Sequence, residues 1–288
     1  MIITVYLALA CALFEAFKDL AAKFALRQYN EWELSWALYI YSLPLLTIAA
    51  LFEPRTTLHP YFLHIVAAAV VMNLAANYCY MRALRYSEMS LSLPLITFTP
   101  VFMLFTSPLF LGESPAPQAL WGIICIVCGC YLLRIDATRK GLLAPFRALA
   151  RSVGPRLMFA VALIWSVTAN FDKLGILYSS PCLWLLANSL LTAVVLTPTV
   201  VWKARSDGRR LPSSRAIMWV GVCSSAAWLF QMQALLRLDA PTVVAIKRTS
   251  VIFGVILGGL VLKEHGLRDR ILAAVLMAAG VAIIAFSS

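Results

Sequence analysis

Eight ionisable residues lie within strongly apolar stretches of this sequence, and their side chains are its main candidates for chemistry. They are Glu15, Lys18, Asp19, Lys23, Asp172, Lys173, Lys247 and Arg248. A charged side chain in an apolar environment is costly unless it faces a cavity or an opposite charge. We therefore expect these residues to face one another or an internal polar site.

The first group of charges has a spacing that predicts one stripe of a helix. Glu15 is followed by Lys18 and Asp19 at three and four residues, and Lys23 follows Asp19 at four. Two interpretations remain open. The charges either form ion pairs that make a polar helix tolerable in lipid, or a carboxylate exchanges a proton as a substrate enters or leaves. Glu15 is the first candidate for this proton-coupling role, and Asp19 and Asp172 rank below it because each has a lysine beside it in the sequence.

Lys247 and Arg248 lie about two helical turns inside an apolar segment, not at its edge. Their long side chains either extend to the membrane surface or point inward. If they point inward, Arg248 would bind an anion through two parallel hydrogen bonds and Lys247 as a point charge. Among the eight charges, five are positive and three negative, which favours an anionic or zwitterionic ligand.

Uncharged polar residues are candidates for the walls of the same site. Each of them could instead form a hydrogen bond that packs two helices together. With the basic residues they make up the expected substrate-binding set, which is Lys18, Lys23, Asn77, Asn170, Lys173, Trp228, Gln231, Lys247 and Arg248.

Patterns that would mark a metal, cofactor or catalytic site are weak. Cys125, Cys128 and Cys130 lie in an apolar run without a fourth ligand, so we expect them to pack and not to bind metal. The sequence has no glycine-rich phosphate loop and no paired nucleophile and base. We expect no metal, no cofactor and no enzymatic activity.

The elements that must position these residues are predicted to be membrane-spanning helices. The 288 residues are 62% hydrophobic and 13% charged, which is too apolar for a water-soluble domain. About 20 apolar residues cross a bilayer as a helix. The predicted fold is an all-α integral membrane protein with ten transmembrane helices, at 3–25, 33–52, 60–81, 89–111, 117–134, 155–177, 181–203, 214–236, 240–262 and 268–286.

The distribution of basic residues predicts the orientation in the membrane. Most of the 24 Lys and Arg residues fall in the connections after the odd-numbered helices. Because cytoplasmic loops are enriched in Lys and Arg, these connections should be cytoplasmic and both termini on the other side of a bacterial-type inner membrane. The net charge of +11 then reflects topology and does not indicate a nucleic-acid partner.

The chain aligns with itself at an offset of about 150 residues. Leu111-Gly112-Glu113 lies over Leu262-Lys263-Glu264, and Lys23 lies over Lys173. This predicts a five-helix repeat at 1–136, a connecting loop at 137–154 and a second repeat at 155–288. Because five is odd, the repeats are inverted, and the charged first helix of each should converge on a site near the membrane midplane.

The first helix resembles that of small multidrug resistance transporters, because Glu15 is followed, after seven intervening residues, by Lys23-Phe24. In that family the membrane-embedded Glu binds a proton and the substrate alternately, and the resemblance implies the same role for Glu15. The doubling to ten helices, with the acidic residues Glu113 and Glu264, looks like the EamA branch of the drug/metabolite transporter (DMT) superfamily. The sequence departs from the small transporters by adding Lys18 and Asp19 and by placing Trp165 where the second repeat would have its own Glu.

The leading functional hypothesis is a secondary transporter that exports small organic metabolites or drugs by alternating access, coupled to protons. Its expected partners are the substrate, protons and the lipid bilayer, and it could act as a monomer. A flippase for a lipid-linked sugar or lysolipid is the alternative. An integral membrane enzyme or receptor is a remote third possibility, because neither a catalytic pair nor a sizeable extramembrane domain is apparent.

Overall fold

The structure is a computed structural model that describes residues 2–54, 57–112, 119–132, 149, 151–208, 211–237, 240–264 and 266–286. Within these ranges the chain is helical and has no strand. The first half contains α1 (Ile2–Ala25), α2 (Glu31–Ile40), α3 (Leu43–Leu51), α4 (Phe62–Tyr86), α5 (Met89–Ser92), the 3-10 helix η1 (Leu93–Thr97), α6 (Phe98–Leu111) and α7 (Ala119–Leu132). The second contains α9 (Val153–Tyr178), α10 (Pro181–Ser206), α11 (Arg215–Leu235), α12 (Ala240–Lys247), α13 (Ser250–Leu262) and α14 (Leu267–Phe286).

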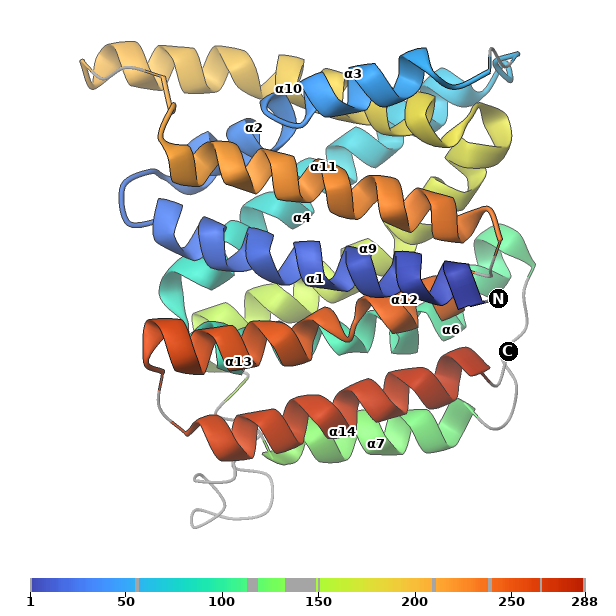
Figure 1. Ribbon diagram of the computed structural model, residues 1–288, viewed down its shortest axis with the longest axis vertical. Coiled ribbons are helices and arrows are strands. Elements are labelled where there is room, and N and C mark those ends of the chain that lie inside the picture. The colour runs from blue at the N-terminus through green and yellow to red at the C-terminus, as the bar shows by residue number, and fades with distance from the viewer. Residues whose placement is uncertain are drawn as a thin grey trace.

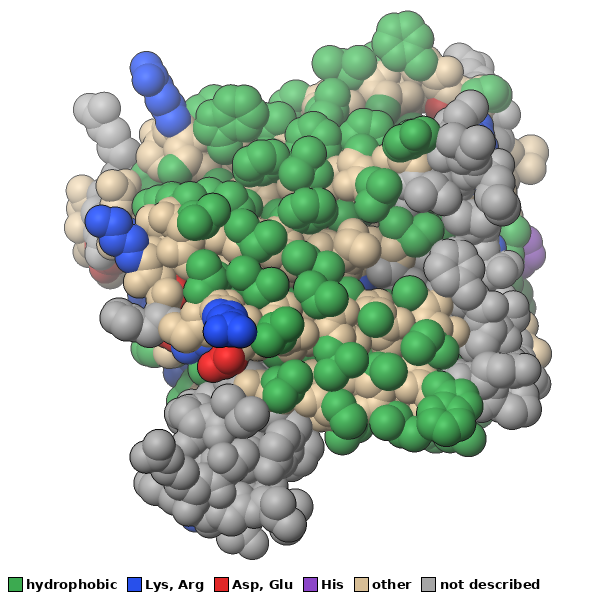
Figure 2. Space-filling view, turned by 60° about the horizontal axis from the view of Figure 1, so that its bottom comes forward, with side chains coloured by type: hydrophobic (Ala, Val, Ile, Leu, Met, Phe, Trp, Pro, Cys, Tyr) green, Lys and Arg blue, Asp and Glu red, His purple; other side chains and the backbone are tan. Residues whose placement is uncertain are grey.

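The protein is a multi-pass membrane protein. Five helical segments among the described residues are long and apolar enough to cross a bilayer: Glu31–Leu51, Phe62–Tyr86, Met89–Leu111, Val153–Tyr178 and Pro181–Ser206. Large apolar side chains such as Leu51, Leu109 and Trp202 are exposed. They belong to a broad apolar surface, and the most prominent Lys and Arg side chains lie on the left of the face in Figure 2. Such a surface suits contact with lipid. Each of the ten predicted ranges contains helix, while the crossing of all ten remains a prediction.

Three predicted helices are interrupted, and the prolines of 89–111 are a sequence signal for one of these interruptions. The range 33–52 divides between α2 and α3, 89–111 contains η1, and 240–262 divides between α12 and α13. In η1, Pro94 lacks a backbone donor, and the Thr97 hydroxyl donates to the Pro94 carbonyl at 2.6 Å. Between α12 and α13, the Thr249 hydroxyl donates to the Ile246 carbonyl at 2.7 Å. At an offset of 151 residues these last two interruptions coincide.

The two halves interlock. The first helix of each half packs along a helix of the other, α1 against α11 and α9 against α4. α7 pairs with α14, and α10 packs on α2 and α3 (Figure 1). This packing of each half against the other brings the charged helices α1 and α12 together within the bundle. The boundaries of the repeats at 136 and 155 remain a prediction.

Glycine permits the close contact between α7 and α14. A Cβ atom at Gly129 would lie 2.8 Å from the Ala273 carbonyl oxygen, and one at Gly280 would lie 2.5 Å from the Gly122 carbonyl oxygen. Gly129 and Gly280 are equivalent in the repeat. Small residues at equivalent positions thus let the last helix of each half approach the other backbone closely. Of the cysteines near this pair, Cys125 is half-buried and Cys128 exposed, while the side chain of Cys130 lies outside the described residues.

Candidate binding site

A buried network of charges joins α1 to the end of α12. Glu15 forms an ion pair with Lys18 through Oε2 and with Lys247 through Oε1, the latter at 2.9 Å. Lys18 also contacts Asp19 at 3.1 Å. The Lys247 ammonium donates a second hydrogen bond to Gln231 Oε1 on α11, at 2.7 Å. The charges of the first helix are therefore neutralised by one another and by a lysine from the other half.

The Asp19 carboxylate is held from α4. Tyr80 is buried and donates its hydroxyl hydrogen to Asp19 Oδ1. The Lys18 ammonium lies over the Tyr80 ring, 5.0 Å from its centroid. Tyr80 also packs against Trp165 of α9, with ring centroids 5.2 Å apart. This tyrosine connects the α1 charges to the opposite first helix.

Arg248 points inward at the junction between α12 and α13. It is 5% exposed, and its Nη2 donates to the Thr99 hydroxyl at 3.1 Å. Its guanidinium lies 5.5 Å from the centroid of Trp165, in the range of a cation–π contact. Arg248 has no carboxylate partner among the described residues, and its buried Nε has no hydrogen-bond partner there. Lys247 and Arg248 thus face the interior and do not extend to the membrane surface.

Asp172 of α9 is a carboxylate without an ion pair among the described residues. Its Oδ1 accepts a hydrogen bond from the Trp184 indole at 2.9 Å. Gly175, one turn further along α9, makes room for that indole, because a Cβ atom there would lie 2.2 Å from the ring. Although Lys173 follows Asp172 in the sequence, the two form no ion pair in the described part of the chain, and the hydrogen bond of Asp172 is to the Trp184 indole.

These groups surround a central cavity of about 100 Å³. Its walls come from both halves, and most of the residues that line it are polar, charged or aromatic. The residues that line it are Glu15, Lys18, Leu38, Tyr39, Asn73, Asn77, Thr99, Trp165, Thr168, Ala169, Asp172, Leu185, Asn188, Ser189, Trp228, Gln231, Met232, Val244, Lys247 and Arg248.

An aromatic pair forms part of the cavity wall. Tyr39 of α2 stacks on Trp228 of α11, with ring centroids 5.6 Å apart. Asn77 donates its amide to the Tyr39 hydroxyl at 2.5 Å and to the Asn73 carbonyl at 2.9 Å. The predicted polar residues Asn77, Trp228 and Gln231 therefore meet in this cavity.

Three predicted binding residues lie elsewhere. Lys23 donates to the carbonyls of Leu84 and Ser87 at the end of α4, the latter at 2.6 Å. Asn170 is fully buried between α9 and α6, where its amide nitrogen donates to the Thr106 hydroxyl at 3.2 Å. Lys173 is half-buried and does not line the cavity.

The charge balance of the site differs from the expected surplus of two positive charges. Without Lys23 and Lys173, the positive groups at the site are Lys18, Lys247 and Arg248. The negative groups are Glu15, Asp172 and, behind Lys18, Asp19. Three ammonium or guanidinium groups face three carboxylates, so the site is formally neutral when all are ionised.

Tyr39, Tyr80, Trp184 and Asn188 were missed by the sequence analysis. Tyr80 could have been found, because it aligns with Gln231 at the offset of 151. Both residues hydrogen-bond a charged group of the network, Tyr80 to Asp19 and Gln231 to Lys247. The other three gave no signal, because aromatic and amide residues are common in membrane helices.

Glu264, the acidic residue after α13, binds the other half at one end of the bundle. Its carboxylate accepts hydrogen bonds from the Met89 and Ser90 backbone amides, at 2.8 and 2.9 Å. Arg270 donates to the Ser90 hydroxyl and pairs with Glu88. Glu264 is thus a contact between halves at the start of α5. The equivalent Glu113 lies outside the described residues.

The chain matches a known family and a solved fold. A family model described as "EamA-like transporter family" matches residues 2–135 and 153–286, once in each half. The chain is similar to a solved structure titled "Crystal structure of protein", with 17% identity and a TM-score of 0.58. That likeness covers 97% of this chain and 95% of the other, and it concerns the fold alone. No curated protein sequence matches the chain.

Proposed function

Because the chain belongs to the EamA-like transporter family of the DMT superfamily, we propose that it exports a small zwitterionic molecule by alternating access, in exchange for protons. The observation that carries this proposal is the central cavity, in which a cation and an anion without ion-pair partners, Arg248 and Asp172, line the same space. The family accounts for transport, and the cavity suggests the cargo.

The cargo class follows from charge complementarity. A cargo carboxylate would bind Arg248, whose guanidinium donates to the Thr99 hydroxyl and lies over the Trp165 ring but forms no ion pair in the described ranges. A cargo ammonium group would bind Asp172, whose described partner is the uncharged Trp184 indole. A molecule with both charges, such as an amino acid, leaves the site neutral. The Tyr39–Trp228 pair offers an apolar wall for its side chain.

The contacts change the order of the proton-coupling candidates. Protonation of Glu15 would disrupt its pairs with Lys18 and Lys247, whereas protonation of Asp172 would disrupt no ion pair among the described residues. We therefore place Asp172 ahead of Glu15 and Asp19. If a proton and the cargo ammonium compete for Asp172, the carrier moves with one or the other, which gives exchange.

The interlocked inverted halves support alternating access. The interruptions in 89–111 and 240–262 fall at equivalent positions and lie beside Thr99 and Arg248. Interrupted helices border the binding sites of many carriers with inverted repeats. An exchange of conformations between the halves would bend these two helices in turn and open the cavity first to one side, then to the other.

Transport into reconstituted vesicles tests the proposal. With radiolabelled neutral amino acids outside and an acidic interior, the wild-type protein should accumulate cargo, because outward proton flow drives uptake. Asp172→Asn, which cannot exchange a proton, should lose this dependence on the gradient. Lys173→Gln, next to it but outside the cavity, should retain it.

Two outcomes would contradict the proposal. Gradient-driven uptake by Asp172→Asn equal to that of the wild type would remove Asp172 from the coupling role. Movement of a lysolipid without uptake of any zwitterion would reject the cargo class and favour the flippase alternative.

A further inference from the structure

Lys247 forms one ion pair among the described residues, and its partner belongs to the other half of the chain. Its ammonium contacts Glu15 Oε1 at 2.9 Å and Gln231 Oε1 at 2.7 Å. Gln231 is uncharged, so Glu15 is the residue in the described ranges that forms an ion pair with Lys247, while Asp172 attracts Lys247 from a greater distance in the same cavity. Removal of Glu15 from this contact would leave a cation in the cavity without an ion-pair partner.

Lys18, the other partner of Glu15, is in a different position. It also contacts Asp19 at 3.1 Å, on the same helix. If the Glu15 carboxylate moved away, Lys18 would therefore keep an ion pair, whereas Lys247 would lose the one that the described residues provide. The contact between Glu15 and Lys247 is the one at which an incoming carboxylate could replace the protein's own.

The surroundings favour such a replacement. Lys247 is the last residue of α12, at the junction with α13, and Arg248 follows it with no carboxylate partner in the described ranges. Glu15, Lys247 and Arg248 all line the cavity. A carboxylate that enters there would be attracted by both cations, and an ion pair with Lys247 would compete with the one that Glu15 forms.

We propose that Glu15 is a built-in competitor of the cargo: its carboxylate occupies on Lys247 the position that the cargo carboxylate takes on binding. This inference rests on the proposed function, since it concerns the same cavity and a cargo with a carboxylate. Cargo binding then breaks the Glu15–Lys247 pair between the halves and frees α1 from α12. The empty carrier keeps that pair, which holds the two halves together when no cargo is bound.

Equilibrium binding of radiolabelled benzoate to the purified protein tests this assignment. Benzoate supplies a carboxylate on an aromatic ring, and benzamide is its uncharged counterpart. Glu15→Gln should bind benzoate about tenfold more tightly than the wild type, because one charge-assisted hydrogen bond becomes available at Lys247. Benzamide should bind both proteins equally. Asp269→Asn, which removes a carboxylate from the exposed start of α14, should behave as the wild type does.

A second pair of variants assigns the gain to Lys247. In the double variant Glu15→Gln with Lys247→Gln, the increase in benzoate affinity should disappear. Glu15→Asp, whose carboxylate is shorter by one methylene, should give a smaller gain and carries the test if Glu15→Gln does not fold.

Three results would overturn the proposal: unchanged or weaker benzoate binding by the folded Glu15 variant, no detectable binding by it, or a gain that persists without Lys247. Failure of the proposed function gives a different pattern. If the protein transports no amino acid but Glu15→Gln still binds benzoate more tightly, the proposed cargo or the proton coupling is rejected. The competition between Glu15 and a carboxylate for Lys247 would still stand.

Discussion

At the scale of single residues, the site is organised by which charges have partners. Glu15, Lys18, Asp19 and Lys247 form ion pairs with one another, while Arg248 and Asp172 form none among the described residues. A buried charge without a counter-ion is costly, and such groups are retained where a ligand or a proton supplies the missing charge. The paired residues therefore maintain the site, and the unpaired ones are its points of recognition.

Arg248 gives a prediction at this scale. Arg248→Gln should weaken binding of a neutral amino acid by about tenfold or more, since it removes a charge-assisted hydrogen bond to the carboxylate. It should weaken binding of the corresponding amino-acid amide much less. Dissociation constants of the purified variant for both ligands measure the difference. Equal losses would mean that Arg248 does not contact the carboxylate.

Adjacency in the sequence was a poor guide to partners. Lys173 follows Asp172, but successive residues on a helix point about 100° apart, so the two side chains do not face each other. The spacing of three and four residues in α1 was a better guide, because it places Glu15, Lys18 and Asp19 on one stripe and they do pair.

At the scale of elements, helices were easier to predict than their interruptions. Each range proposed from hydropathy contains helix, because length and apolar composition are properties of the segment itself. The junction at Arg248 depends on Thr99 and Trp165 from other helices, and no local sequence pattern reports those contacts. Pro94 was a local signal for the interruption at η1. The segment 240–262 has no proline at the position equivalent to Pro94 in the repeat, so its interruption had no such signal.

The contact between α7 and α14 gives a prediction about stability. Gly280→Ala should destabilise the protein by about 1–3 kcal/mol, because the added methyl group has no space in a close-packed contact. Ala279→Leu, at the exposed neighbouring position of α14, should leave the stability nearly unchanged. Thermal unfolding in detergent compares the two. A Gly280→Ala protein as stable as Ala279→Leu would mean that the helices can separate without cost.

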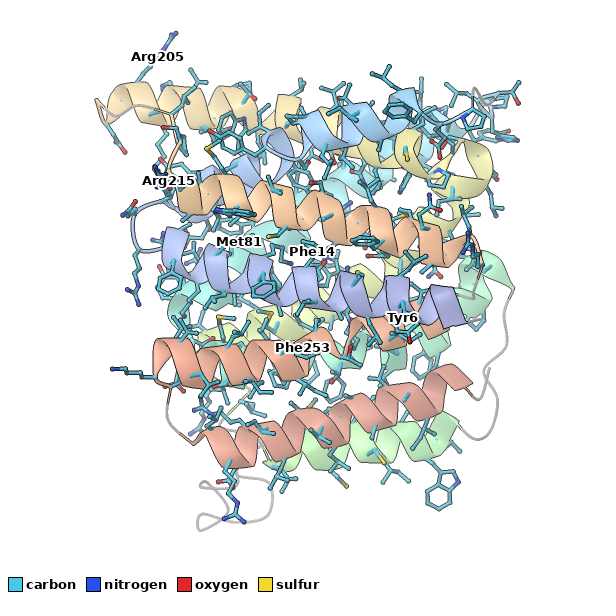
Figure 3. The ribbon with its side chains drawn as sticks, in the orientation of Figure 1. Tyr6, Phe14, Met81, Arg205, Arg215 and Phe253 are labelled. Atoms are coloured by element: carbon cyan, nitrogen blue, oxygen red, sulfur yellow. The ribbon has the colours of Figure 1, made fainter. Side chains whose placement is uncertain are left out.

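At the scale of the whole molecule, the two ends of the helix bundle differ in which parts of the chain they contain. Figure 3 shows Arg205 and Arg215 at one end of the bundle, and Tyr6 toward the opposite end. α1 begins at the same end at which α14 finishes (Figure 1). The basic connection between α10 and α11 is thus far from the start and the finish of the chain, as the distribution of Lys and Arg requires.

We predict that the end with Arg205 faces the cytoplasm and that the end with Tyr6 faces the other side of the membrane. In a protein whose native cysteines have been replaced, Tyr6→Cys should react with a membrane-impermeant thiol reagent in intact cells. Arg205→Cys should react only after the cells are permeabilised, because basic connections remain in the cytoplasm. The reverse labelling pattern would invert the orientation and leave the fold unchanged.

The family and the two-repeat architecture were predictable because the two halves of the sequence are still similar to each other and to the family. The interlocking of the halves was not, since an offset between two segments does not say which helices touch. Lys23 illustrates this difference. Its alignment with Lys173 indicated the repeat correctly, yet the contacts of Lys23 with α4 place it outside the cavity.

The pairing of α1 with α11 also bears on how the protein is made. A ribosome delivers α1 well before α11 and Lys247, which belong to the second half of the chain. Until then Lys18 is the partner available to Glu15 and Asp19 on the same helix, so it offsets one of their two negative charges while the first helix enters the bilayer. The short-range pairs that contribute to the finished site thus also lower the cost of inserting α1, and Lys247 completes the balance later.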